Sequence, residues 1–386
     1  MTVPPPGPRS GWPAGTGRRR FLGLMSALPL LGQGGVLTPL APASSAAHLP
    51  PGALPGGAAH AVPAVPFPHG AAAMLIGGPR QGRLHQWAVR LAPALGEALP
   101  PGTAVGLTCI GGLDGVTAAN QFGARARPDG QTLLVAPGNA ALAWLAGDAR
   151  ARFDVGAWVT VLTAASPGVL IGRFGPGDLR AGRKLRMAVS GRDGADLAGL
   201  LALELLGARP RPMPAMSPAA VRAALAAGTL DAALLVGEHV AARTAALVRL
   251  GLRPVATLGT VDATGRPLRD PAFPDLPQVA ELFAEVHGRA PSGPLYEAWR
   301  ATAAAAQMAF GMQLPQLTSA AMVALWRQAG AHAVRQPGVA AAAARAGLRP
   351  LAGPEALAAA RQIAVGTPAL LALRQWLDRR LPRQPA

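Results

Sequence analysis

The feature that most constrains this chain is an alternation of short apolar runs and longer amphipathic segments that begins near residue 72. Apolar runs of strand length lie at 72–76, 105–110 and 132–136. Between them, segments 83–99 and 116–126 have apolar residues at helical spacing. Glycine pairs or a Pro-Asp-Gly turn separate the segments. This β-α-β-α-β series predicts a parallel sheet covered by helices.

The alternation continues in the second half of the chain. Further strands are predicted at 158–162, 169–171, 185–189, 231–236 and 254–258, and helices at 195–206 and 221–227. From about residue 276 the chain is predicted to be mostly helical, because its alanine-rich runs are good helix formers. A length of 386 residues indicates about two domains of ~150 residues each.

Charge and composition narrow the class of partner. The chain has 36 basic and 19 acidic residues, a formal charge of +17, and Lys184 is its one lysine. The arginines are scattered and aromatic residues are only 4% of the chain, which argues against a nucleic-acid platform. A net positive field attracts small anions instead. We therefore expect a small organic anion as ligand and no nucleic-acid partner.

The chain lacks the motifs of the common catalytic and metal sites. It contains no P-loop, no His-Glu-x-x-His pair and no Gly-x-Ser-x-Gly elbow. Its one cysteine, Cys109, excludes an internal disulfide and is predicted to be a buried residue of an apolar strand. These observations predict a protein that is not an enzyme and that needs neither metal nor cofactor.

The first seventy residues have the composition of a targeting segment and a spacer. Arg18, Arg19 and Arg20 precede an apolar stretch and then a run of small residues, the pattern of a twin-arginine export signal over 1–47. A retained membrane anchor is the alternative interpretation. Residues 48–70 are rich in proline, glycine and alanine, and we interpret them as a flexible linker.

Three stretches suggest a family. The first is Gly-Leu-Asp-Gly at 112–115, followed by a helix and by Pro-Asp-Gly-Gln-Thr-Leu-Leu-Val at 128–135. The second is Pro-Asp-Leu-Pro-Gln at 274–278, and the third is the order of segments from 323 to 350. Together they resemble the substrate-binding receptors of tripartite tricarboxylate transporters, the Bug-type periplasmic proteins, over about residues 72–380.

The resemblance implies a type II periplasmic binding-protein fold, with two α/β lobes and a ligand cleft between them. Lobe 1 is expected at 71–165 and 262–386, and lobe 2 at 166–261. It also implies a monomeric periplasmic receptor that captures a small carboxylate for a membrane transporter or a sensor.

Two glycine-rich turns at equivalent positions of the two lobes are the predicted binding elements. Each turn opens a helix after a strand, where free backbone N–H groups and the helix dipole favour an anion. Ligands of open α/β sheets bind at this edge of the sheet. The predicted ligand-binding residues are Gly77, Gly78, Arg80, Arg83, Gly138, Asn139, Ser190, Gly191, Arg192, Asp193, Gly194 and Glu238.

The first turn departs from the family pattern, which keeps alternatives open. Arg80 and Arg83 stand in a loop where the family has small polar residues and an acid. Arginine binds carboxylates bidentately, so the change favours anions. It also allows a divergent paralogue that binds no ligand and acts through protein contacts. An exported enzyme on the same fold is a third, less favoured class.

Overall fold

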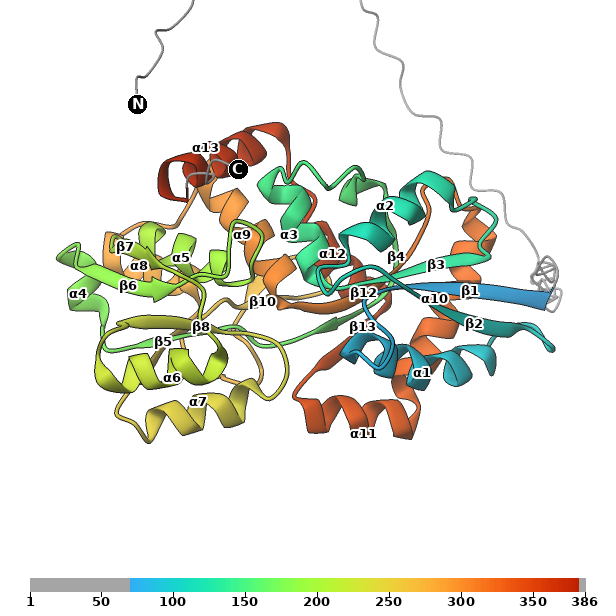
Figure 1. Cartoon of the computed structure of the whole chain (residues 1–386), viewed down its shortest axis with the longest axis horizontal. Helices are drawn as coiled ribbons and strands as arrows, with labels where there is room; N and C mark the ends of the chain where they lie inside the picture. The colour runs from blue at the N-terminus through green and yellow to red at the C-terminus, as the bar shows by residue number, and fades with distance from the viewer. Residues whose placement is uncertain (1–69, 382–386) are drawn as a thin grey trace, which may run out of the picture. The chain divides into compact units, whose positions relative to one another are not determined.

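The computed structural model describes residues 70–381, and two sheets organise them (Figure 1). The first has the strand order β13-β4-β12-β3-β1-β2. Its strands are β1 (Ala71–Gly77), β2 (Ala104–Ile110), β3 (Thr132–Ala136), β4 (Val159–Ala165), β12 (Met308–Leu314) and β13 (Arg349–Ala352). β1 pairs in parallel with β2 and β3, with Leu75 opposite Thr108 and Leu134. β12 runs antiparallel to β3 and β4, and β13 antiparallel to β4.

The second sheet has the order β7-β6-β8-β5-β9. Its strands are β5 (Val169–Gly172), β6 (Lys184–Ala188), β7 (Arg209–Met213), β8 (Ala232–Leu235) and β9 (Arg253–Thr257). β6 is parallel to β7 and β8, whereas β5 is antiparallel to β8 and β9. A two-stranded ribbon, β10 (Thr260–Val261) and β11 (Pro267–Leu268), follows β9.

Helices cover both faces of each sheet. They are α1 (Arg83–Gly96), α2 (Val116–Arg125), α3 (Gly138–Ala146), α4 (Pro176–Arg180), α5 (Asp196–Leu205), α6 (Pro218–Ala227), α7 (Val240–Val248), α8 (Val279–His287), α9 (Pro294–Gln307), α10 (Ala320–Arg335), α11 (Pro337–Ala346), α12 (Gly353–Arg361) and α13 (Thr367–Arg380), with a 3₁₀ turn, η2 (Val155–Ala157). None of the helices within 70–381 is long and apolar enough to cross a bilayer.

The core follows from the alternation of strand residues. Leu133 and Val135 of β3 join a cluster with α1 and α10, whereas Leu134 and Ala136 join one with α2 and α3. In the second sheet, Ile171 of β5 faces α6 and α7. Helix α9 packs against α3, α5 and α13, so one apolar cluster contains residues of both sheets.

The two-sheet α/β architecture confirms the predicted fold class, and the individual elements differ in places. β12 was missed, because its residues are buried on both faces and lack alternation, and no glycine or proline separates it from α9. β7 was missed because it contains two prolines, which an edge strand tolerates. The first helix ends at Gly96 and not at 99. Cys109 is half-buried in edge strand β2 and not fully buried.

Some predictions stay predictions. The export signal at 1–47 and the linker, up to residue 69, lie outside the described residues. The strands of the second sheet fall within the stretch predicted as lobe 2. Helix α8, in a stretch assigned to lobe 1, packs against α4 and β9.

Candidate functional site

A cavity of about 530 Å³ lies where the loops of the two sheets meet. Loops that follow β1, β2, β6 and β8 line it, together with the start of α3 and the start of β12. These loops leave the carboxyl ends of parallel strands, the edge at which ligands bind in open α/β sheets. We call this cavity the cleft.

Glycine is required where the first loop passes the second. A Cβ on Gly77 would lie 2.9 Å from Cα of Gly115, and Gly115 itself has a φ of 73°. Gly78 differs, because a Cβ there would meet no atom within 4 Å. Gly78 is itself buried, but the cleft leaves room for a side chain beside it.

Three helices, α1, α3 and α5, begin at the cleft, and α7 begins two residues after the lining residue Glu238. In none of the four do the first-turn N–H groups donate a hydrogen bond to the side chain of the N-cap residue. First-turn N–H groups of a helix otherwise need a partner, and together they carry a partial positive charge. The sequence places glycine, proline or alanine at three of these caps and His239 at the fourth. Such ends offer donors to an anion.

An ion pair crosses the cleft between α1 and the loop after β8. Arg83 Nη1 lies 3.6 Å from Glu238 Oε2, and Trp87 Nε1 donates a hydrogen bond of 3.3 Å to Glu238 Oε1. The Arg83 side chain is 71% exposed and that of Glu238 21%. A single long contact at this exposure contributes little to stability. Glu238 nevertheless accepts from the Trp87 indole N–H and lies beside the Arg83 guanidinium.

A second ionic group lies at another side of the cleft. Arg150 pairs with Asp114 at 2.8 Å, with Asp148 at 2.6 Å and with Asp193 at 3.2 Å. Asp114 follows β2 and Asp193 follows β6, so Arg150 joins loops of the two sheets. Its hydrogen bonds to Asp148 and then to Asp114 raise the pKa of Arg150 above its ordinary value, so it stays charged. The cleft lining thus holds three carboxylates, those of Asp114, Asp193 and Glu238, and one guanidinium, that of Arg83.

Most of the predicted site residues line the cleft. These are Gly77, Gly78, Arg83, Asn139, Ser190, Asp193, Gly194 and Glu238. Arg80, Gly138, Gly191 and Arg192 are not among the lining residues. The Arg192 guanidinium instead binds Asp378 Oδ1 at 2.7 Å and the Leu381 carbonyl at 2.6 Å. Gly138 is packed, since a Cβ there would lie 1.9 Å from the Ala305 carbonyl.

Several residues that line the cleft were not predicted from the sequence. Trp87 has the helical spacing of a core residue, and only its indole N–H reaches Glu238. Leu113 and Asp114 belong to the glycine-rich stretch that suggested the family, so that motif was the available signal. Leu113 is 79% exposed, which is unusual for a leucine.

One polar contact fixes the second glycine-rich loop beside the cleft. Ser190 donates from both its N–H and its hydroxyl to Asp196 Oδ2, which holds the second loop on the first turn of α5. Residues 70–381 contain no group of three or more His, Cys, Asp or Glu side chains that could hold a metal ion.

Comparison with known proteins supports the fold. The structure is similar to a TctC solute binding protein from Polaromonas without ligand, with a TM-score of 0.59 and 14% identity, over 80% of this chain and 98% of that chain. Two weaker likenesses have TM-scores of 0.47 and 17% identity. The periplasmic binding protein BugD matches over 80% of this chain and 97% of that chain, and MatC from Rhodopseudomonas palustris with bound malate over 78% and 99%. No protein-family model and no curated protein matches the chain. At 14% identity the likeness concerns the fold, and it confirms the architecture that the sequence resemblance predicted, that of a TctC solute binding protein.

Proposed function

We propose that this protein is a solute-binding receptor that captures a small carboxylate in the cleft. The observation that carries the proposal is the convergence of three helix N-termini without side-chain caps, those of α1, α3 and α5, on one cavity of about 530 Å³. A cavity of this size suits a small molecule. The likeness of the fold to a TctC solute binding protein supports the same class of function.

Backbone N–H groups, more than arginines, are expected to hold the ligand. Arg83 is paired with Glu238, and Arg150 is shared among Asp114, Asp148 and Asp193. An anion that used either guanidinium would have to displace a carboxylate of the protein. The first turn of α1 presents N–H donors without that competition. The Gly78 N–H already donates to the Ile76 carbonyl at 2.9 Å, and the first turn of α5 donates in part to the Gly194 and Ala195 carbonyls.

The proposal extends to the location of the receptor, its two lobes and the delivery of its ligand. A monomeric periplasmic receptor would bind between two lobes, 71–165 with 262–386 and 166–261, and deliver its ligand to a membrane transporter or a sensor. It would bind without catalysis and without a cofactor. Replacing both Arg18 and Arg19 by lysine is expected to keep the precursor in the cytoplasm, which fractionation of expressing cells would measure.

The test of ligand capture is a thermal-shift screen followed by titration calorimetry. Dicarboxylates, tricarboxylates, aromatic acids and amino acids are screened, and a true ligand at a hundredfold excess over Kd stabilises the fold by about 2.7 kcal/mol. Gly78→Val directs a branched side chain into the cleft and is expected to abolish binding. Gly175→Val is the matched control, because a Cβ at Gly175 also meets nothing within 4 Å and its φ of −149° suits valine.

The two variants can be compared because a Cβ at either position meets no atom within 4 Å. Loss of binding in Gly78→Val with retention in Gly175→Val supports capture in the cleft. Equal affinity in the two variants would contradict it.

One observation favours a second candidate, a divergent paralogue that acts through protein contacts. Glu238 lies where a ligand carboxylate would meet Arg83 and the Trp87 indole, as though the protein supplied its own carboxylate. Under this candidate no acid of the screen stabilises the parent, whereas Glu238→Gln gains affinity for acids. A parent that binds as well as Glu238→Gln would exclude it.

A further inference from the structure

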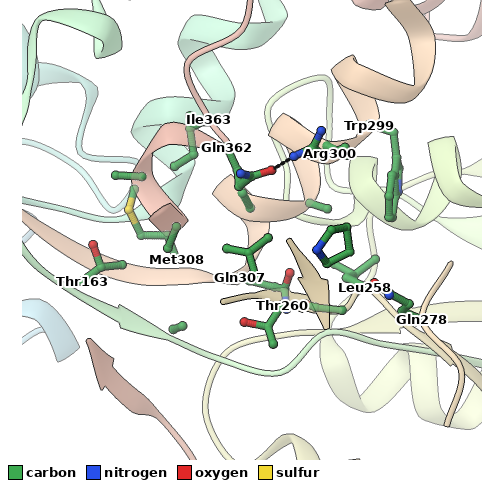
Figure 2. Close-up of a pocket in the computed structure, with 18 of the residues that line it drawn as sticks. Thr163, Leu258, Thr260, Gln278, Trp299, Arg300, Gln307, Met308, Gln362 and Ile363 are labelled. Atoms are coloured by element: carbon green, nitrogen blue, oxygen red, sulfur yellow. Dashed lines mark hydrogen bonds between the residues drawn. The ribbon is translucent and has the colours of Figure 1, made fainter. Parts of the chain in front are cut away.

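A second cavity lies beside two connecting segments, away from the loops of the cleft. The first, 166–168, joins β4 of the first sheet to β5 of the second, and the second, 258–259, joins β9 of the second sheet to β10 of the ribbon. Thr163 and Ala165 at the end of β4, Leu258 and Gly259, and residues of α9 and α12 line a space of about 80 Å³ (Figure 2). We call this space the connector cavity. Its volume exceeds the ~10–15 Å³ that one water needs by several times.

The walls of the connector cavity are mostly apolar. Leu258, Met308, Leu351 and Ile363 line it, and Trp299 forms one side, its indole N–H already bound to the Ala198 carbonyl. An apolar wall of this kind favours the hydrocarbon part of a ligand.

One cation enters this apolar space without an acidic partner. Arg300 of α9 donates to the neutral amide oxygen of Gln362, and it makes no ion pair with any residue of 70–381. Figure 2 shows Arg300 and Gln362 on one side of the cavity and Gln307 and Thr260 on the other. Burial raises the pKa of Tyr296 while the charge of Arg300 opposes that rise, which agrees with a guanidinium that faces the same space. A half-buried guanidinium with only a neutral partner is suited to an anion.

One buried hydroxyl of the wall lacks a hydrogen-bond partner. Thr163 is 3% exposed, and its hydroxyl oxygen makes no hydrogen bond. Buried polar groups normally have a partner, and one left without it is costly. The connector cavity therefore combines a cation, a hydroxyl free to bond and an apolar wall.

From these contacts we infer that the connector cavity is a second ligand site, which takes a small monocarboxylate with an apolar body. Arg300 is the one charged residue of the lining, so a second carboxylate would be left without a partner. The small volume limits the body to a short chain or a single ring. Benzoate and butyrate represent this class.

The position of the site couples it to the arrangement of the two sheets. The ligand would touch Ala165 just before the first connecting segment and Gly259 in the second. Gln307 Nε2 already donates to the Gly259 carbonyl at 2.9 Å, which ties the end of α9 to that segment. A ligand that prefers one arrangement of these segments shifts the population towards it.

The test is calorimetric titration of the whole protein with benzoate and butyrate, with the neutral amides benzamide and butyramide as isosteres. Arg300→Gln is expected to weaken acid binding at least tenfold, and Arg300→Lys to restore part of it. Ala304→Leu fills the space from α9 and is expected to abolish binding. Arg335→Gln changes an exposed arginine of α10 that does not line the cavity, and this variant is expected to bind like the parent.

The cleft variant separates this site from the proposed function. Binding of benzoate that persists in Gly78→Val but falls in Arg300→Gln and Ala304→Leu supports a second site. Binding lost in Gly78→Val and unchanged in the two α9 variants assigns the acid to the cleft and overturns the inference. Equal binding of acid and amide would overturn the inference as well. So would the absence of binding of either acid at ~10 mM.

Discussion

The cleft and the connector cavity differ in how their charges are satisfied. In the cleft, Arg83 meets Glu238, and Arg150 holds Asp114 and Asp193, so guanidinium and carboxylate groups come from opposite sides. In the connector cavity, Arg300 meets only the amide of Gln362. The cleft is thus the larger cavity, and its charges are paired. The connector cavity is smaller, and its one charge is unpaired. Met308 lines both cavities.

This difference shows that net charge is a poor guide to an anion site. The chain has a formal charge of +17, yet acids outnumber arginines in the cleft lining. Exposed loops bring acidic and basic side chains together because an ion pair at the surface changes the stability of the fold only slightly. An apolar wall does not offer such partners, so its one cation remains available to a ligand.

The largest effect is expected at Gly138, where α3 packs against the end of α9 and the start of β12. A Cβ at Gly138 would lie 1.9 Å from the Ala305 carbonyl oxygen and 2.7 Å from that of Met308. Gly138→Ala therefore forces α3 away from α9 and β12 and is expected to lower the free energy of unfolding by about 3 kcal/mol or more. Chemical denaturation measures this change, with Gly78→Ala as the control that stays within about 0.5 kcal/mol. Equal stability of the two variants would mean that α3 does not pack as described.

Ionic strength distinguishes the two kinds of site. If backbone N–H groups hold the cleft ligand, its affinity changes little between ~50 and ~500 mM salt. Glu238→Gln releases Arg83, whose side chain is 71% exposed. The affinity of this variant for acids is expected to weaken several-fold as salt rises over the same range. Titrations at the two salt concentrations give both slopes. A steep slope in the parent would show that an arginine already carries its affinity.

A smaller effect is expected from the exposed leucine of the cleft. Leu113 is 79% exposed, and a ligand with an apolar body would cover it. Leu113→Ser is expected to weaken aromatic acids a few-fold in the cleft, because about 25 cal/mol is lost per Å² of apolar area no longer buried. Binding in the connector cavity and stability are expected to stay unchanged. Calorimetry with one aromatic and one short polar acid measures the contrast.

The smallest effect concerns a buried acid beside the connecting segments. Burial raises the pKa of Asp270, so the native state holds its proton more tightly than the unfolded chain. The free energy of unfolding then falls as pH rises from about 4 through the native pKa. Asp270→Asn removes this pH dependence. It is expected to raise the free energy of unfolding by less than about 1 kcal/mol at pH 7 and to leave it unchanged at about pH 3.

Asp231 supplies the control of opposite sign. Its hydrogen bond from Arg186 holds its pKa below the ordinary value, so its contribution is present above about pH 4 and is lost on acidification. Asp231→Asn is therefore expected to destabilise at pH 7 and to match the parent at low pH. Denaturant titrations across this range test both aspartates, and parallel profiles for the two variants would contradict the assignment.

Local signals in the sequence were enough for the strands and helices that alternate. The glycine pair at 77 and 78 and the Pro-Asp-Gly turn mark where β1 ends and β3 is about to begin. β12 escaped detection because a strand buried on both faces reads like the helix before it.

The loops of the cleft could be predicted, but their pairing could not. A glycine-rich turn after a strand is a local feature, so Gly78 and Gly194 were found. The contact of Arg83 with Glu238 joins residues far apart in the chain, and no local pattern encodes it. The connector cavity is assembled from β4, α9, β12 and α12, and for the same reason nothing in the sequence indicated it.

Met308 gives the molecule a natural spectroscopic reporter. Met308 lines both the cleft and the connector cavity. The chain has nine methionines, few enough for a ¹³C-methyl spectrum in which each resonance can be assigned by substitution. One methyl signal would then register occupancy of either cavity, and its displacement when both are filled would reveal whether the two ligands sense each other through a single side chain.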